Sequence, residues 1–367
     1  MIATPPFGDA PDYTPLTVLP ELPARWIATL LPNGIPDEPH ATCDRCAMCS
    51  DDAPAGSASF FHPDAKCCTY EPALPNFIVG RILRDTDPAM QFGRRTVEAR
   101  MAARLSATPW GLEPTRRHRV LYGNSPELFG RAPDLRCPHY QGDGAEGTCG
   151  IWRHRNAVCA TWHCKHVRGD VGLQFWRSLS GLLSEAEWAL GAWCVTELGG
   201  PTAELCRVMD RTTTRLAPAD LGGPPNQAEY EAYWGSWTGR ESEYFTRAAA
   251  LVDPLDWAAV ERIGGVRIRA HATLVRDAYQ ALVSTELPQR TTLGTLRVLS
   301  AADGKCTVQT YSGYDPLRMP ATLISLLPQF DGSDTHETVT RIASASGVQL
   351  GDGIIRKLLD FGLLRKA

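Results

Sequence analysis

The sequence predicts a mainly α-helical protein with a cysteine-rich, loop-rich metal-binding domain and a small α+β module at its C-terminus. Three observations lead to this prediction. Nine of the 12 cysteines lie between Cys43 and Cys164, in a segment with many turn residues. Apolar residues recur at helical spacing over most of residues 171–283. From about Thr291 the apolar period changes to two, which is typical of β-strands.

The composition is that of a globular protein with enough chain for two or three domains. The 367 residues are 43% hydrophobic and 21% charged, which argues against a disordered chain, a collagen and a coiled coil. No stretch approaches the roughly 18 apolar residues of a membrane helix, and no secretory signal opens the chain. The net charge of -4 gives no reason to expect a nucleic acid or a membrane as partner. We therefore expect a cytoplasmic protein in a reducing compartment, where disulfides are rare.

Changes in composition divide the chain into four segments. A proline-rich N-terminal extension, residues 1–42, contains one expected short helix at Arg25–Leu31. The expected cysteine-rich metal domain follows at 43–170, and the expected helical domain at 171–289. The last segment, 290–367, is the α+β module.

Apolar spacing places helices before and within the helical domain. A short apolar element is expected at Phe77–Leu83, and a helix at Thr96–Leu105. A long helix is expected from Val171 to near Gly199, with further helical pattern at about 227–252 and 257–283.

The C-terminal segment reads as a β-hairpin followed by three short helices, an order typical of a winged-helix-like module. The expected strands are Thr292–Ser300 and Lys305–Tyr311, with a turn at Asp303-Gly304. The expected helices are Met319–Gln329, one opened by the capping pair Asp334 and Glu337, and Asp352–Leu359.

Clustered cysteines in a reducing compartment indicate metal binding. Thiolate is a soft ligand that suits zinc, copper(I) and iron–sulfur clusters better than magnesium or calcium. An isolated cysteine is more often a small buried hydrophobe, which is our interpretation of Cys194, Cys206 and Cys306. The nine candidate metal ligands are Cys43, Cys46, Cys49, Cys67, Cys68, Cys137, Cys149, Cys159 and Cys164.

The spacing of these cysteines favours iron–sulfur clusters over zinc. Structural zinc is usually held by two short pairs of ligands, whereas Cys43-x2-Cys46-x2-Cys49 offers three thiols on one loop. Cys-x2-Cys-x2-Cys is the spacing of bacterial ferredoxin loops, which hold four-iron clusters. Nine cysteines would serve one or two 4Fe-4S clusters and leave one thiol over. The adjacent Cys67 and Cys68 are expected to point apart and to serve two centres; zinc remains the alternative metal.

Part of the cysteine pattern resembles a known family. Cys149-x-Ile151-x3-Arg155-x3-Cys159 resembles the signature Cys-x-Ile-Tyr-x2-Arg-Pro-x2-Cys of the YkgJ-like cysteine-cluster proteins, a family described only as zinc- or iron-chelating. The opening cysteines and the Cys67-Cys68 pair resemble the Cys-x2-Cys-x2-Cys-Cys of that family, apart from an inserted stretch, 50–66. The resemblance covers about residues 43–168. It implies metal chelation by the nine cysteines, and the family includes flagellin lysine N-methylases that look like iron–sulfur proteins.

The C-terminal module shows a second resemblance. Its hydrophobic pattern, with Asp331-Gly332 after the first expected helix, resembles the small winged-helix modules of PqqD type. Such modules recognise leader peptides in ribosomal peptide biosynthesis, so the resemblance implies a peptide partner. A winged helix used only for packing or dimerisation is the alternative interpretation.

Basic and imidazole side chains near the cysteines are candidate substrate ligands. The stretch 79–136 holds eleven arginines against six acids, a net charge of +5. Arginine suits carboxylate or phosphate, although a solvated helix face is the better explanation for most of these charges. The candidate substrate-binding residues are Arg94, Arg95, Arg155, His163 and His166.

Histidines gather beside the last cysteines, at His139, His154, His163 and His166. One of them could be a non-cysteine metal ligand, but we favour a role beside the site, because histidine often only borders a metal centre.

Two functional hypotheses follow. The first is an iron–sulfur enzyme, an oxidoreductase or transferase, that modifies a peptide, protein or amino-acid-like small molecule. The second is a zinc- or cluster-stabilised binding or scaffold protein without catalysis. An iron with an exchangeable ligand position would favour the first.

Overall fold

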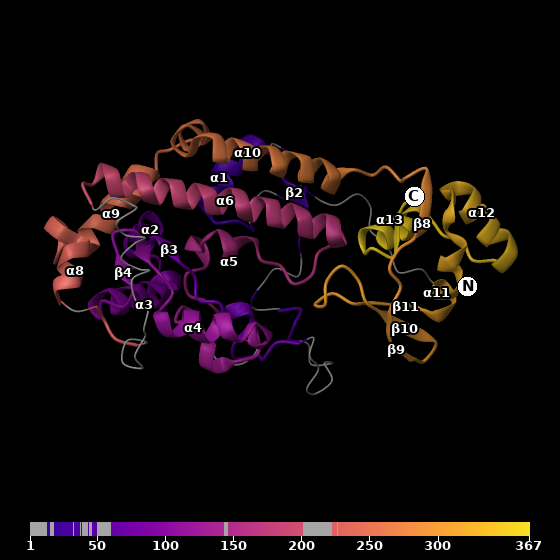
Figure 1. Ribbon diagram of the computed structural model, residues 1–367, viewed down its shortest axis with the longest axis horizontal. Coiled ribbons are helices and arrows are strands. Elements are labelled where there is room, and N and C mark those ends of the chain that lie inside the picture. Colours follow the sequence, from indigo (N-terminus) through magenta and orange to yellow (C-terminus); the bar gives the residue numbers. More distant parts are fainter. Residues whose placement is uncertain are drawn as a thin grey trace.

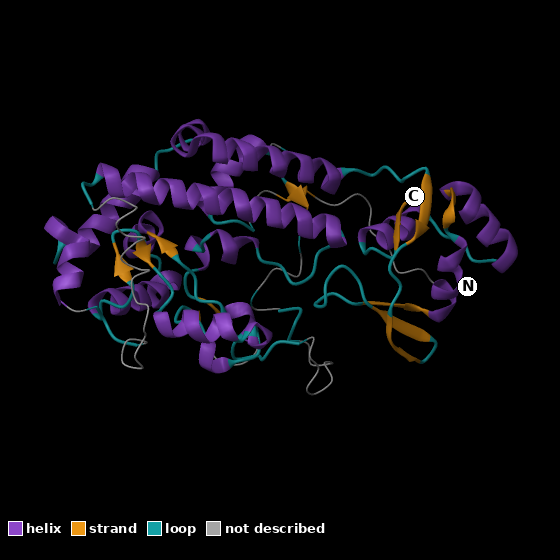
Figure 2. Cartoon of the chain, viewed as in Figure 1, coloured by secondary structure: helices purple, strands orange, loops and turns teal. Residues whose placement is uncertain are grey.

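A computed structural model describes residues 13–14, 18–31, 33–36, 38, 43, 46–49, 60–142, 146–200, 222–225 and 227–367. The described chain is mainly helical with small antiparallel sheets, as the sequence predicts. Figure 1 shows an elongated molecule in which the C-terminal module lies at one end of a larger helical body. Figure 2 shows the strands as short pieces at the edges of that body and within the module.

Two long helices form the backbone of the larger body. Helix α6 (Gly169–Glu197) and helix α10 (Trp257–Val283) run side by side, as Figure 1 shows. The expected long helices are therefore confirmed. Helix α10 is interrupted at Gly265, whose φ of 63° and ψ of -139° suit glycine alone.

Shorter helices and two-residue strands cover these long helices. The helices are α1 (Glu21–Leu30), α2 (Asn76–Arg84), α3 (Gln91–Ala102), α4 (Arg116–Asn124), α5 (Ala157–Thr161), α8 (Gln227–Trp234) and α9 (Glu241–Val252). The strands pair as β1 (Tyr13–Thr14) with β2 (Ile35–Pro36), β3 (Leu74–Pro75) with β5 (Gly111–Leu112) and β4 (Ala107–Thr108), and β6 (Tyr140–Gln141) with β7 (Thr148–Cys149).

Some expected elements differ from the structure at their ends. The apolar element at 77–83 is helix α2, and the helix expected at 96–105 begins at Gln91. The helical pattern at 227–252 is two helices, because Gly235 and Gly239 take positive φ angles of 51° and 79° that end an α-helix.

The first three expected segments share one hydrophobic core. Trp26 of the N-terminal extension, Phe77 of the cysteine-rich segment and Phe175 of the helical segment belong to the same buried cluster. The boundaries expected at 42/43 and 170/171 therefore do not separate independent cores. Apolar faces of all three segments can be buried only against one another.

The C-terminal module has a core of its own, built by residues such as Phe330, Ile342 and Leu358. Its elements are β8 (Arg290–Leu293), β9 (Val298–Ala302), β10 (Lys305–Val308), β11 (Leu317–Pro320), α11 (Ala321–Leu326), β12 (Asp331–Asp334), α12 (Thr335–Ser346), α13 (Asp352–Asp360) and β13 (Leu364–Lys366). They form two sheets, with strand orders β11-β10-β9 and β12-β8-β13.

The hairpin and the capping pair of the module are confirmed with one change. Strands β9 and β10 meet at Asp303-Gly304, both with positive φ, as a tight hairpin turn requires. The expected first strand is divided, because 290–293 pairs in the other sheet. The side chain of Asp334 accepts hydrogen bonds from the N–H groups of His336 and Glu337, so it caps α12.

Two further expectations concern single features. Cys194 and Cys306 are buried with reduced thiols, as expected of small hydrophobes, while Cys206 lies outside the described residues. Within the described part of the chain, no helix is long and apolar enough to cross a bilayer.

Candidate metal centre

Six of the nine clustered cysteines line one cavity of about 170 Å³. The cavity lies between the loops before α5, the 3-10 turn at Lys66–Thr69 and α5 itself. The six cysteines are Cys43, Cys67, Cys68, Cys137, Cys149 and Cys159. The structure therefore brings together thiols that are separated by up to 116 residues in the sequence (159 minus 43).

Backbone hydrogen bonds hold the cysteine-bearing loops in place. The N–H of Cys137 donates to the carbonyl of Cys68 at 2.6 Å. Cys149 on β7 lies opposite Tyr140 on β6. Asn156 caps α5 by accepting the N–H of Cys159 at 3.0 Å, which fixes that thiol at the first turn of the helix.

The other three cysteines do not line the cavity, although two of them contact each other. The thiols of Cys46 and Cys49 share a hydrogen bond, which lowers the pKa of Cys46 to about 6 and raises that of Cys49. Burial raises the pKa of Cys164, and negative charge on Cys67 or Cys46 raises it further. All nine thiols therefore lie in one electrostatic neighbourhood.

The cavity cysteines are reduced; Cys137 is buried and the other five are partly buried. None of the eleven described cysteines forms a disulfide. Burial raises the pKa of Cys43 to about 12 and also raises those of Cys137, Cys149 and Cys159. Raised pKa values favour the protonated thiols, and a bound metal would replace their protons.

Cys67 and Cys68 lie on one 3-10 turn, and both line the cavity. Their thiols hydrogen bond to each other, which lowers the pKa of Cys67 and raises that of Cys68. Within that turn Cys68 has φ -75° and ψ 24°. That the two cysteines point apart and serve two centres stays a prediction.

Among the described residues, no three His, Cys, Asp or Glu side chains are gathered closely enough to hold one metal ion. The six thiols instead surround a shared space.

Two buried cations face the thiols. Lys66 is 2% exposed and donates from Nζ to the carbonyl oxygens of Cys43 and Gly147. Arg155 is 8% exposed and donates to the carbonyl oxygens of Val18, Trp152 and Cys159. Positive charge on both side chains lowers the pKa of Cys43, against the larger effect of burial.

Sequence reasoning singled out Arg155 but missed Lys66. A lysine directly before two cysteines was the available signal. Its φ of 51° is unusual for a residue with a side chain, and it directs the chain into the turn that carries Cys67 and Cys68.

His139 lies on the wall of the cavity. It is 1% exposed, and its Nδ1 is 2.6 Å from the hydroxyl of Thr96 on α3. Its Nε2 is buried without a hydrogen-bond partner. Burial lowers the pKa of His139 to about 3, so the ring is neutral.

No family model, curated protein or solved structure matches the chain. The site must therefore be interpreted from its own chemistry.

The other candidate substrate ligands lie away from the cavity wall. Arg94 and Arg95 are on α3, where Arg94 donates to the carbonyl of Asp85 and Arg95 is exposed. His163 packs on Trp176 with ring centroids 4.2 Å apart, and His166 lies 3.1 Å from the hydroxyl of Tyr311. Neither histidine nor these two arginines line the cavity, so their role in binding substrate stays a prediction.

Aromatic side chains complete the cavity wall. Trp162 is 45% exposed and packs edge-on against Phe129, with centroids 5.1 Å apart. The guanidinium of Arg155 lies 3.4 Å from the ring centroid of Trp152. The aromatic wall residues are Tyr70, Tyr122, Phe129, Tyr140, Trp152 and Trp162.

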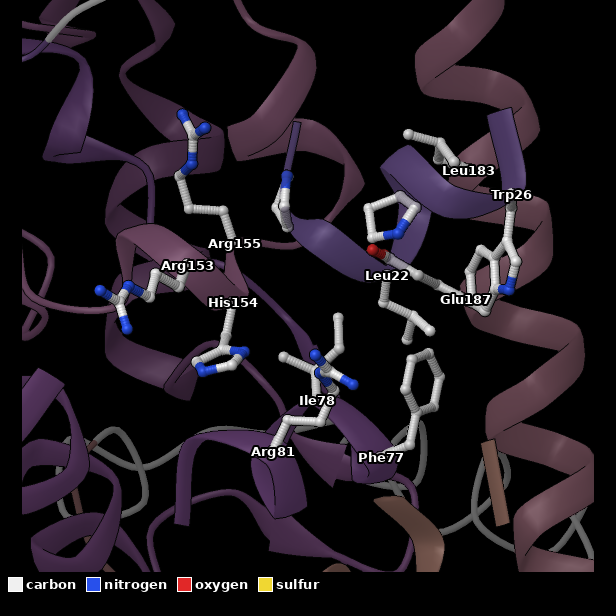
Figure 3. Close-up of a pocket in the computed structure, with 12 residues that line it drawn as sticks. Leu22, Trp26, Phe77, Ile78, Arg81, Arg153, His154, Arg155, Leu183 and Glu187 are labelled. Atoms are coloured by element: carbon white, nitrogen blue, oxygen red, sulfur yellow. The ribbon is translucent and has the colours of Figure 1, made fainter. Parts of the chain in front are cut away.

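A second, much smaller pocket of about 20 Å³ lies between α1, α2 and α6. Figure 3 shows Glu187 among apolar side chains that include Leu22, Trp26 and Phe77. Burial raises the pKa of Glu187 to about 8, against the effect of the Ala157 N–H that it accepts at 2.6 Å. The pocket is too small for a substrate. It is a gap in the packing beside Glu187, which contacts the start of α5.

Proposed function

We propose that this protein binds an iron–sulfur cluster in the cysteine-lined cavity and modifies a peptide, protein or amino-acid-like substrate there. The observation that carries the proposal is the convergence of six reduced cysteines, one buried and five partly buried, on one cavity of about 170 Å³. Buried cysteines scattered through a core would pack against separate neighbours instead.

The spacing of the donor groups supports a cluster over zinc. In a 4Fe-4S cluster each thiolate binds a different iron, so the sulfurs stand further apart than around one ion. The cavity of about 170 Å³ that six cysteines line is the feature of this chain that supports a cluster. With nine cysteines in one neighbourhood, one or two clusters remain the proposal.

The charges around the cavity support the same assignment. A cluster with four thiolate ligands is anionic, and placing it in a protein interior is unfavourable unless cations lie nearby. Lys66 and Arg155 supply two buried positive charges beside the thiols. An iron–sulfur cluster would bring electron transfer or Lewis-acid chemistry to this cavity.

The substrate class rests on the wall and on the module beside it. The aromatic wall suits an apolar or amide-bearing chain, which packs on flat rings. Tyr314 from the loop between β10 and β11 packs on Phe61 and Phe129, with centroids 5.6 Å and 6.4 Å apart. The C-terminal module therefore reaches the cavity region, and its element order α11-β12-α12-α13-β13 supports the proposal of a winged-helix-like module.

The test is anaerobic purification followed by iron, sulfide and zinc analysis with a visible absorption spectrum. We expect a brown protein with about four or eight iron and sulfide per chain, since a 4Fe-4S cluster holds four of each. A colourless protein with one or two zinc ions would overturn the proposal and leave a zinc-stabilised binding or scaffold protein.

Three alanine variants locate the site. Cys137→Ala and Cys159→Ala each remove a thiol from the cavity wall and should lower the iron content at least twofold. Cys194→Ala removes a buried thiol far from the cavity, against the carbonyl of Ala248, and should keep its iron. Equal iron content in all three variants would overturn the assignment of the cavity.

A further inference from the structure

Two buried histidines of the described chain, His139 and His163, have ring nitrogens without a hydrogen-bond partner, and of these two only His139 lines the cysteine cavity. The backbone of His139 is fixed by a hydrogen bond: its carbonyl accepts the N–H of Gly150 at 2.8 Å, which connects its loop to the segment after Cys149. His139 lines the cysteine cavity, two residues after Cys137. Its Nε2 has no hydrogen-bond partner, although the residue is only 1% exposed.

Hydrogen-bond counting fixes which ring nitrogen carries the proton. The hydroxyl of Thr96 has one proton, and it donates that proton to the carbonyl of Gly93 at 2.7 Å. Thr96 can then only accept from His139, so Nδ1 of the ring must be the donor across their 2.6 Å contact. A neutral imidazole with a proton on Nδ1 leaves a free lone pair on Nε2.

A buried lone pair without a partner is costly unless something binds it. Three cavity cysteines are connected to His139 through the backbone. Cys137 lies two residues before it, and the carbonyl of Cys68 accepts the Cys137 N–H. Cys149 directly precedes Gly150, whose N–H donates to the His139 carbonyl. Metal-binding histidines commonly donate their second ring nitrogen to a hydroxyl, carbonyl or carboxylate, which orients the ring. The pair of His139 and Thr96 has that form.

We propose that Nε2 of His139 is an iron ligand of the cluster, beside cavity cysteines such as Cys68, Cys137 and Cys149, and that Thr96 is the positioning residue that orients it. The inference rests on the proposed function, because it needs iron in the cavity. A neutral imidazole in place of a thiolate makes the cluster less negative. Its reduction potential should then be higher than with four cysteine ligands.

The test is pulsed electron paramagnetic resonance on the reduced protein, prepared with ordinary histidine and with ¹⁵N-histidine. We expect a nitrogen coupling that changes with the isotope. The coupling should disappear in His139→Cys, which supplies a thiolate instead, while the iron content stays within about a factor of two. In that variant the reduction potential should fall.

His118→Gln is the matched control. His118 is also buried, but its Nε2 lies 2.8 Å from the carbonyl of Thr69, so that nitrogen carries a proton and has no free lone pair. The nitrogen coupling and the potential should be unchanged in this variant. Thr96→Val should weaken the coupling or move the potential, and Thr96→Ser, which keeps the acceptor, should restore both.

The outcomes separate the two proposals. Iron and sulfide without an isotope-sensitive coupling in the unaltered protein would overturn the role of His139 and leave the cluster proposal intact. A coupling that survives in His139→Cys would assign the nitrogen to another residue and overturn it as well. A protein without iron would overturn both.

Discussion

Arg155 shows how one side chain serves both the fold and the charge balance of the cavity. Its guanidinium donates to three backbone carbonyls from separate parts of the chain and stacks on Trp152. Arginine suits this place because its planar fork can satisfy several acceptors at once, whereas lysine carries a single point of charge. Its position within the Cys149–Cys159 motif therefore has a structural reason beside any role in binding substrate.

Replacing this side chain tests that structural role. Arg155→Lys keeps the charge but loses the stacking and at least one of the three hydrogen bonds, each worth about 1 kcal/mol. We expect a loss of about 1–3 kcal/mol in the free energy of unfolding, measured by urea denaturation of the purified protein. Arg153→Lys is the control, since Arg153 is 53% exposed and pairs with Asp87 at the surface. Equal stability of the two variants would contradict the prediction.

Glu187 predicts a pH dependence of stability. Burial raises its pKa from 4.5 to about 8 in the folded protein. Below pH 4.5 the Glu187 carboxyl is protonated in both the folded and the unfolded protein. Between pH 4.5 and about 8 only the folded protein keeps the proton, so the free energy of unfolding falls as pH rises through this range. Glu187→Gln cannot ionise and keeps an oxygen for the Ala157 N–H.

The measurement is the free energy of unfolding of the Glu187→Gln variant minus that of the unaltered protein, from pH 4.5 to pH 9. We expect this difference to grow in favour of the variant as pH rises and to level off above about 8. A difference that stays constant over this range would contradict the burial of an uncharged carboxyl.

At the scale of elements, close packing of α2 on α9 depends on one glycine. A methyl group at Gly80 would lie 1.8 Å from the carbonyl oxygen of Phe245 and 2.9 Å from the side chain of Ala249. The two helices therefore touch backbone to backbone at this point, which no larger residue permits. This contact holds α2, which follows the turn with Cys67 and Cys68, against the helical body.

Two glycine substitutions test this contact. Gly80→Ala should destabilise the protein by more than about 2 kcal/mol, because backbone must move to make room. Gly123→Ala on α4 is the matched control: nothing lies within 4 Å of the added methyl, and alanine should stabilise the helix by up to about 1 kcal/mol. Thermal unfolding of the two variants gives the comparison, and a Gly80→Ala protein as stable as Gly123→Ala would disprove the close contact.

Elements could be predicted from the sequence where the pattern is long or the turn chemistry is specific. The 29-residue α6 has apolar residues on its buried face throughout, and Asp303-Gly304 fixes a hairpin turn locally. The ends of α3 and the split at Gly235 could not be predicted, because short helices are stabilised mainly by tertiary packing.

At the scale of the whole molecule, one buried ion pair joins the C-terminal module to the helical body. Arg168, directly before α6, forms a two-pronged contact with Asp360 at the end of α13. It also donates to the carbonyl of Leu282 at the end of α10. Asp360 is 4% exposed, so removing one partner would leave the other buried without its counter-charge.

We expect Arg168→Met to loosen the module. The exposed Glu286 lies in the segment between α10 and β8, and a glutamyl endopeptidase should cut there several times faster in this variant. The double variant Arg168→Met with Asp360→Leu should recover part of the protection, because no unpaired charge remains. Arg267→Met, which removes an exposed pair with Glu185, is the control and should be cut at the original rate.

The sequence by itself determined the helical class, the hairpin and the nine candidate ligands, because these depend on local period, turn chemistry and residue type. Only the tertiary structure decided which thiols share a cavity: Cys43 and Cys159 meet there, whereas Cys46, Cys49 and Cys164 do not line it. It also decided the buried position of Lys66 and the orientation of His139 on Thr96. The physical reason is that side chains far apart in the chain come together only when one shared core forms, and the spacing of residues in a sequence does not specify these contacts.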